Sequence, residues 1–365
     1  MDSADVAGAA KAVAKPRLEW DSGTAYDFFT SLFVVHKPEE FGLRASWAAG
    51  VRSRLAEDTR SFMADVQHFV GVPGHWIHGL PAPKDSRVAL LELERLGPAA
   101  VIEAIVLPEC RDDPHSVEVL KRVYAARSWS KADADELCAD PAAKGHGRKG
   151  SEECTRLEGW LDWISRPDDF GRMYLKGMAE FRESFFREEE RRIAPYVERR
   201  LREAQERSKA LDTTELLEEL TQGLRTGHHL DQPRLLLVPC FWCSPRIIYG
   251  ILEPGARFIL FGARPPDASL VPEDEVPASL YLALNALADT TRLNALRLLR
   301  DEPLTQAQLA RRLRLRPSTM SHHLKTLRIA GLITYLEGEG AELRYAARVS
   351  AVKEACAAIG SFLKL

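Results

Sequence analysis

The side chains with the clearest chemical potential lie in a short segment near the C-terminus, where small polar and cationic residues are interleaved with apolar ones. The apolar residues recur at i, i+4 and i+7, a spacing that places them on one side of a helix: Met320, Leu324 and Leu327. The polar residues fall on the other side: Ser318, Ser321, His322 and Lys325. Their hydroxyl, imidazole and ammonium groups can bond to base edges and phosphates, as can Thr319 beside them. The pattern therefore predicts a helix that enters the major groove of double-stranded DNA.

The charge around this helix favours the same interpretation. From Arg311 to Arg328 the chain has six basic residues and no acidic one. We expect the arginines that precede the helix to hold the phosphate backbone and to set affinity more than sequence preference: Arg311, Arg312, Arg314 and Arg316. Residues 278–365 carry 13 basic and 7 acidic residues, a balance of +6, whereas the net charge of the chain is −3, so the remainder stands at −9. This split indicates a nucleic-acid-binding domain attached to an acidic domain with another task.

The elements that must position these residues are predicted by hydrophobic periodicity. Three helices come first: Ser279–Arg300, Thr305–Leu313 and Ser318–Leu327. A β-hairpin follows, with strands Ile333–Leu336 and Leu343–Ala346 and a turn at 337–341, and then a last helix, Ser350–Leu365. A hairpin directly after the DNA-reading helix is the order of a winged helix-turn-helix. We expect Arg344, in this wing, to reach a minor groove or a phosphate.

Two stretches carry a family resemblance. LADTTRLNALRLL (Leu287–Leu299) and RPSTMSHHLKTLRIAGLI (Arg316–Ile333) resemble the corresponding segments of ArsR-type winged-helix regulators, and the resemblance covers residues 280–348. It implies a bacterial transcription factor that binds an imperfect palindrome as a homodimer, with the terminal helices pairing two subunits. Family members often have Ser where Arg316 stands; Pro317 at the first helical position and the Ser318 hydroxyl would compensate for the lost N-cap.

The resemblance also bears on metal sensing. Many members bind metal through cysteines in the first helix of the motif or through Asp and His on the last helix. The corresponding stretches here, Leu304–Leu309 and Ser350–Ala355, contain neither thiolate nor imidazole ligands. We therefore expect no metal at these positions, and no cofactor.

The rest of the chain is predicted to be a larger helical domain with a short β region, so the fold class is mainly α with small β elements. Continuous apolar runs at Leu235–Pro239 and Arg257–Phe261 predict two strands, and Pro16–Asp21 a third. The polar stretch at 131–150 is predicted to be a loop. The predicted organisation is a disordered tail at 1–15, an N-terminal helical sensor or dimerisation domain at 16–262, a Pro-rich linker at 263–277 and the winged helix at 278–365.

Two other groups of residues have ligand-like spacing. Cys240 and Cys243 form a CxxC pair, which suits a redox switch or, with His228 and His229 nearby, part of a zinc site. The alternative, which we favour, is a purely structural role as two small buried thiols beside a strand. Three histidines lie within eleven residues, and here too we favour a structural loop over a metal site: His68, His75 and His78.

The leading hypothesis is a homodimeric DNA-binding transcription regulator, expected to be a repressor and not an enzyme. The N-terminal domain would sense a small-molecule effector or enlarge the dimer interface. The alternatives are a thiol-redox or ligand-binding protein, enzymatic or not, that uses the winged helix for docking, and a winged helix devoted to protein contacts. Six scattered cysteines and no bilayer-length apolar run predict reduced thiols, no membrane partner and a cytoplasmic location.

Overall fold

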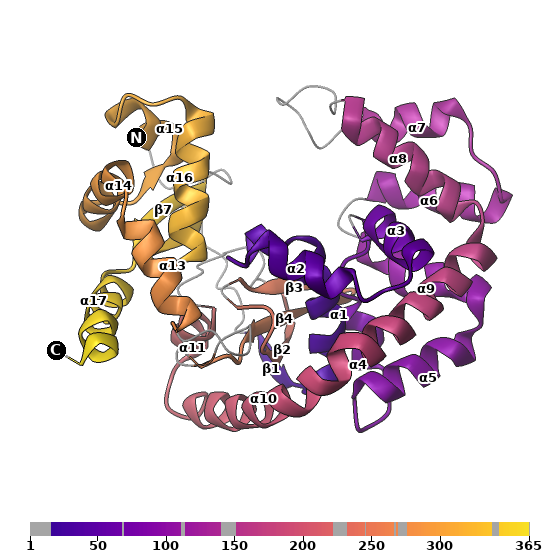
Figure 1. The fold of residues 1–365 in the computed structure, drawn as a ribbon, viewed down its shortest axis with the longest axis horizontal. Coiled ribbons are helices and arrows are strands. Elements are labelled where there is room, and N and C mark those ends of the chain that lie inside the picture. Colours follow the sequence, from indigo (N-terminus) through magenta and orange to yellow (C-terminus); the bar gives the residue numbers. More distant parts are fainter. Residues whose placement is uncertain are drawn as a thin grey trace, which may run out of the picture.

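The computed structural model describes residues 16–67, 69–110, 114–139, 151–221, 232–244, 246–265, 268, 276–337 and 343–364. Some predictions fall outside these residues: the disordered tail, His68, His228, His229, most of the linker and the turn of the wing. Within the described residues the chain is mainly helical with two small sheets, which confirms the predicted fold class (Figure 1).

Residues 16–262, here called the helical domain, are built from helices around a small sheet (Figure 1). The α-helices are α1 (Thr24–His36), α2 (Ala45–Arg52), α3 (Glu57–Val66), α4 (Gly74–His78), α5 (Ser86–Leu96), α6 (Pro114–Ala126), α7 (Lys131–Cys138), α8 (Ser151–Ile164), α9 (Pro167–Phe181), α10 (Arg187–Arg207) and α11 (Thr213–Leu220). Short 3₁₀ or π segments are η1 (Pro38–Glu40), η2 (Pro98–Ala100), η3 (Ile102–Val106), η4 (Leu107–Cys110) and η5 (Arg182–Phe186). Because η5 joins α9 to α10 without a break, these three elements form one long helical path.

The sheet of the helical domain contains β1 (Arg17–Trp20), β2 (Arg234–Cys240), β3 (Ile248–Glu253) and β4 (Ala256–Gly262) in the order β1-β2-β4-β3. β2 pairs in parallel with both β1 and β4, whereas β3 is antiparallel to β4. Leu235 and Leu237 pack with residues of α10 and α11 on one face, and Leu236 and Val238 join the main core on the other. Burial of both faces is the physical reason for the continuous apolar run in β2.

Residues 278–365, here called the winged helix, form a separate core. Their elements are α13 (Ala278–Leu287), α14 (Thr290–Asp301), β5 (Leu304–Thr305), α15 (Gln306–Arg312), α16 (Pro317–Ile329), β6 (Ile333–Glu337), β7 (Leu343–Ala347) and α17 (Val349–Leu363). The strands form a sheet in the order β5-β7-β6. Side chains from α14, α15, α16 and β6 make a continuous apolar cluster beneath the sheet.

Two local predictions were wrong, and one strand was missed. The single helix expected over Ser279–Arg300 is broken between α13 and α14, because the Asp289 carboxylate accepts a hydrogen bond from the Arg292 backbone N–H at 2.8 Å and caps a new helix. The predicted loop at 131–150 begins as α7, which starts with a capping box at Ser130 and Asp133. β3 was not predicted, since Gly250 interrupts its apolar pattern and lies against the Phe258 ring.

The prediction of reduced cysteines also fails for one pair. Cys138 and Cys154 form a disulfide that joins α7 to α8. Cys240, Cys243 and Cys356 are free thiols.

The helical domain touches the winged helix directly (Figure 1). Gly42, after η1, has a φ of +73°, and a Cβ there would lie 2.5 Å from Leu282 Cδ2 in α13 and 3.0 Å from Ile329 Cγ2 in α16. Only glycine allows this close approach without strain. The C-terminal end of α16 is therefore held against the helical domain, whereas its N-terminal end is not part of this contact.

None of the helices within the described ranges combines the length and the apolar character needed to cross a membrane.

Candidate nucleic-acid interface

Helix α16 separates its apolar and polar side chains as its sequence predicts. Met320, Leu324 and Leu327 are at most 2% exposed and belong to the core of the winged helix. The predicted DNA-facing residues of this helix are all exposed: Ser318, Thr319, Ser321, His322 and Lys325. Pro317 is at the first helical position, and Arg316 takes the N-cap position without a side-chain capping bond. The helix therefore starts through the fixed φ of proline, as predicted.

A tight turn sets the angle between α15 and α16. α15 begins with a capping box in which the Thr305 hydroxyl accepts from the Gln308 backbone N–H at 3.2 Å. Arg314, in the turn, has a φ of +57°, a left-handed conformation that costs a non-glycine residue about 1 kcal/mol. The Gln306 side chain donates to the Pro317 carbonyl at 2.8 Å and ties the start of α15 to the start of α16. The two helices are thus fixed relative to each other before any partner binds.

The arginines of this region are exposed, but they are not equivalent. Arg311, Arg314, Arg316 and Lys325 form no ion pair or side-chain hydrogen bond with any residue that the structure describes. Arg312 donates to the Glu302 carboxylate at 2.6 Å. Arg344 is exposed on β7, opposite Thr305 and Leu336 in the register of the sheet. All ten predicted DNA-binding residues therefore lie on the surface, and their contacts with DNA remain a prediction.

Several positioning residues are not apparent in the periodic pattern. Arg292 donates to the backbone carbonyls of Ala286 and Asn285 at 2.7 Å each, so it joins α14 to the end of α13. His323 is partly buried, with Nδ1 3.8 Å from the Asp289 carboxylate, so it packs at the start of α14. The N-cap signal of Asp289, an acid directly before a helical stretch, could have located this junction.

The comparison with protein families bears on this region alone. Residues 289–335 match the family model described as bacterial regulatory protein, arsR family. The chain carries an ArsR-family helix-turn-helix domain. The match runs from the Asp289 cap through α14, α15 and α16 into β6, so it contains both helices of the predicted interface. This ArsR-family domain identifies the protein, at family level, as a DNA-binding transcription regulator preceded by a long N-terminal region. Searches of curated proteins and of solved structures found no match to the chain.

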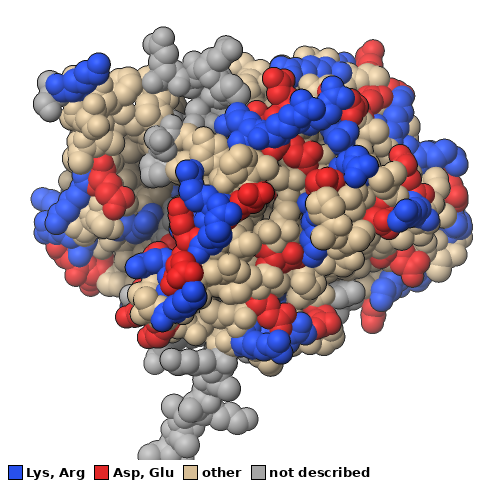
Figure 2. All heavy atoms as spheres, turned by 90° about the horizontal axis from the view of Figure 1, so that it is seen from below, with Lys and Arg blue, Asp and Glu red and all other residues tan. Residues whose placement is uncertain are grey.

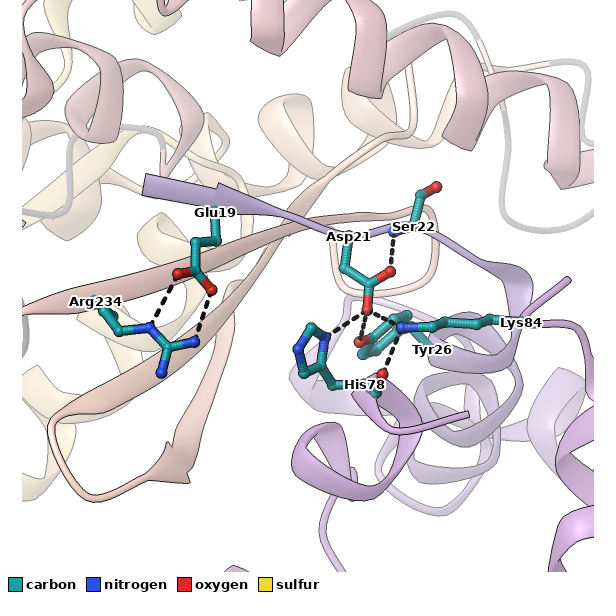
Figure 3. Close-up of polar contacts among 7 residues, drawn as sticks. All are labelled: Glu19, Asp21, Ser22, Tyr26, His78, Lys84 and Arg234. Carbon is teal, nitrogen blue, oxygen red and sulfur yellow. Dashed lines mark hydrogen bonds and ion pairs between the residues drawn. The ribbon is translucent and has the colours of Figure 1, made fainter. Parts of the chain in front are cut away.

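In the helical domain, a group of ionisable side chains surrounds Asp21, just after β1 (Figure 3). Asp21 Oδ2 accepts from the Tyr26 hydroxyl and from His78 Nδ1, at 2.8 Å each, and from Lys84 Nζ. Burial alone would raise the pKa of Asp21, but these donors hold it below its ordinary value. Because Lys84 also donates to the His78 carbonyl at 2.6 Å, the group ties β1, α1 and the segment from α4 to α5 together. The bonds of this cluster therefore serve to hold these elements of the fold together.

Arg234 makes a second ionic link across the same sheet. It donates to the two carboxylate oxygens of Glu19 at 2.9 Å each (Figure 3). It also donates to the Glu253 carboxylate. The bond from Arg234 is the main reason that the pKa of Glu19 lies below its ordinary value. A single guanidinium therefore joins β1, β2 and β3.

The CxxC pair is buried at the end of β2. Cys240 Sγ donates to Asp27 Oδ1 at 3.2 Å, and Cys243 Sγ donates to the Cys240 carbonyl at 3.2 Å. Burial raises the pKa of the Cys240 thiol and raises the pKa of Asp27 to about 7, although the Trp242 backbone N–H donates to Asp27 at 2.9 Å. Thiols that are buried and protonated react slowly with oxidants, so this environment favours the structural interpretation of the pair.

The predicted histidine group is also engaged in the fold. His75 Nε2 lies 2.9 Å from the Ala104 carbonyl and His78 is bonded to Asp21. Short helix α4, and not a loop, carries both. Among the described residues, no group of three or more His, Cys, Asp or Glu side chains is placed to hold a metal ion.

Proposed function

We propose that the protein is a transcriptional repressor that binds a palindromic operator as a homodimer. The observation that carries the proposal is the exposed face of α15 and α16, where four cations without an ion pair or side-chain hydrogen bond to any described residue surround small polar side chains: Arg311, Arg314, Arg316 and Lys325. Such a face matches a phosphate backbone flanking the major groove. Repression would follow from an operator that overlaps a promoter.

The dimer is supported by the unburied apolar residues of the terminal helices. No residue of α17 is buried, and Phe362 and Leu363 are 44% and 57% exposed. On α13, Tyr281 and Leu284 are 48% and 42% exposed. Exposed apolar side chains gathered on adjacent helices are typical of a protein interface. We therefore place the dimer contact on α13 and α17, as the family resemblance implies.

We further propose that the protein acts by binding and not by catalysis, in the cytoplasm where it meets the chromosome. The ionisable residues around Asp21 are bonded to one another, and the CxxC thiols are buried. In this proposal the helical domain senses a small molecule and passes the signal to the winged helix through the contact at Gly42.

The test is selection of bound duplexes from a random DNA library, followed by measurement of the mass of the protein in solution. We expect one enriched motif with two-fold symmetry, half-sites separated by about one or more helical turns, and a dimeric mass at micromolar concentration. Failure to enrich any palindrome, together with a monomeric mass, would overturn the proposal. A reporter gene behind the selected motif then distinguishes repression from activation.

A further inference from the structure

A cavity of about 290 Å³ lies between the helical domain and the winged helix. One wall comes from the segments after the CxxC pair and after β4, including Ser244 and Arg264. The opposite wall comes from α13, the turn after α16, and α17, and it is mostly apolar. The volume is at the small end of the range found for ligand sites, which is about 300–1,000 Å³.

Arg264 is the unusual residue of this cavity. Its side chain as a whole is partly exposed, but its Nη1 atom is buried and has no hydrogen-bond partner among the residues that the structure describes. Within the described part of the chain, Nη2 bonds to the Ser244 carbonyl alone, at 3.4 Å. Burial lowers the pKa of Arg264 to about 10; the nearby Cys243 opposes this shift, and Arg192 adds to it. The guanidinium is therefore charged at neutral pH, poorly hydrated and short of acceptors, a state that costs free energy unless an anion is present.

A second guanidinium lines the cavity from the other domain. Arg348, at the start of α17, donates from Nη1 to the Gly331 carbonyl at 2.8 Å. Burial lowers the pKa of Arg348, while the charge of Glu354, which also lines the cavity, raises it. Among the described residues the walls thus carry two cations and one anion, and the remaining balance is one positive charge.

We propose that this cavity binds a small organic monocarboxylate, whose carboxylate pairs with Arg264 and whose apolar body packs against Leu280, Leu332 and Ala355. The fork of an arginine fits a carboxylate with two parallel hydrogen bonds. A single negative charge matches the remaining charge of the walls, and the apolar wall excludes a fully hydrated ion. Inorganic phosphate satisfies the charge but leaves the apolar wall uncovered.

The ligand would act as an effector because it touches both domains. Gly331 and Leu332, which line the cavity, lie in the turn after α16, and Arg348 is bonded to the first of them. A molecule held between Arg264 and this turn would change the position of the DNA-reading helix relative to the helical domain. This regulatory part rests on the proposed function, whereas the binding site itself does not.

Thermal unfolding of the full chain tests the site. Benzoate, phenylacetate and hexanoate are the probes, benzamide is the neutral match for benzoate, and inorganic phosphate tests for a simple anion site. We expect at least one carboxylate to raise Tm by about 3 °C or more at saturation, and benzamide and phosphate to have no such effect. No response to any carboxylate, an equal response to benzamide, or a response to phosphate alone would overturn the proposal.

Substitution of Arg264 separates a ligand-binding role from a structural one. Arg264→Met keeps the stem and removes a largely buried charge that has no ion-pair partner among the described residues, so the unliganded variant should be at least as stable as the wild type and should lose the carboxylate response. Arg207→Met, which removes an exposed arginine paired with Glu219 at 2.5 Å, should retain the response. Destabilisation of unliganded Arg264→Met, or an unchanged response, would contradict the assignment. Arg348→Met should weaken the response from the other wall.

The regulatory part is tested by DNA binding with and without the stabilising carboxylate. We expect operator affinity to change by about 5-fold or more, and to stay constant in Arg264→Met. Carboxylate binding by a protein that binds no duplex would refute the proposed function and leave the site intact. Duplex binding without carboxylate binding would refute the site and leave the proposed function intact, and binding of both without coupling would refute the effector role.

Discussion

The helical domain and the winged helix use their arginines differently. In the helical domain the guanidinium groups of Arg122, Arg207 and Arg234 are each bonded to carboxylates, and positive and negative side chains are interspersed over the right-hand part of the face in Figure 2. On the face of α15 and α16, Arg311 and Arg316 have no such partner among the described residues. Like charges gathered without counter-charges reduce stability, so a face that keeps them is suited to a negative partner. The comparison separates arginines that hold the fold from arginines that are available to DNA.

The largest effect that tests this comparison is the salt dependence of DNA binding. A dimer that neutralises several phosphates should lose about 10³-fold in operator affinity between 50 and 200 mM salt. Replacement of Arg311, Arg314, Arg316 and Lys325 by Ala should flatten the plot of log affinity against log salt, measured by fluorescence anisotropy. Arg122→Ala, which removes a paired arginine of the helical domain, is the control and should leave the slope unchanged. Equal slopes for the wild type, the quadruple variant and Arg122→Ala would mean that the four replaced cations of α15 and α16 contribute no more to DNA binding than the paired arginines of the helical domain.

The second prediction concerns a buried charge of the helical domain. Burial raises the pKa of Asp27 from 3.8 to about 7, so the folded protein holds a proton that the unfolded chain releases between these values. This contribution to stability is complete below about pH 4 and is lost as the pH rises through about 7. Asp27→Asn keeps an oxygen acceptor for the Trp242 N–H and removes the charge, so it should stabilise the protein at pH 8 by roughly 2–4 kcal/mol and much less at pH 5.

Urea unfolding followed by tryptophan fluorescence at the two pH values measures this difference. Glu198→Gln, at an exposed position of α10, is the control and should have little effect at either pH. If Asp27→Asn were less stable than the wild type at pH 8, the ionised carboxylate would have a stabilising role that its burial does not predict.

The third prediction distinguishes base recognition from phosphate contact within the interface. Ser321→Ala should cost about 1–3 kcal/mol on the selected operator and less on a scrambled duplex, because a base contact discriminates between sequences. Arg311→Ala should weaken both duplexes by similar factors, since a phosphate contact carries no sequence information. Competition titrations with the two duplexes give these ratios. The same loss on both duplexes for Ser321→Ala would remove Ser321 from the base-reading set.

The smallest effect separates conformation from charge at a single position. Arg314 has a φ of +57°, so Arg314→Gly should relieve the strain that Arg314→Ala keeps, and the two variants should differ by about 1 kcal/mol in stability. Both variants lack the cation and should lose the same amount of DNA affinity. Thermal unfolding and anisotropy measured on the same samples test the two statements together. Unequal DNA affinities would mean that the turn geometry, and not the charge, sets the contribution of Arg314.

The interface could be predicted from the sequence because its pattern is local. Met320, Leu324 and Leu327 mark the buried side of one helix. The helical period then places the polar residues between them on the exposed side. The strands β2 and β4 were predictable for a similar reason, since each is a continuous apolar run buried on both faces. The partners of these strands were not predictable, because pairing depends on residues far apart in the chain.

Features that depend on the meeting of distant segments were missed. Arg264 and Arg348 share a cavity only because the two domains touch, and neither has a distinctive neighbourhood in the sequence. The prediction of an effector site within residues 16–262 stays a prediction, and the carboxylate site that we propose differs from it by also using the winged helix. The ion pair between Arg312 and Glu302 has the same origin, since a charge run alone does not show which of its members already has a partner.

The pairing of β1 with β2 has a consequence for biosynthesis. Glu19 and Arg234, which join these strands, are separated by 215 residues, so β1 leaves the ribosome long before its partner strand exists. Closing so long a loop is slow, because its entropy must be lost before the strand contacts form. The winged helix, by comparison, contains mostly local contacts and can fold as soon as it emerges. The sheet can therefore form only after β2 has been made, and until then β1 stays unpaired on the nascent chain.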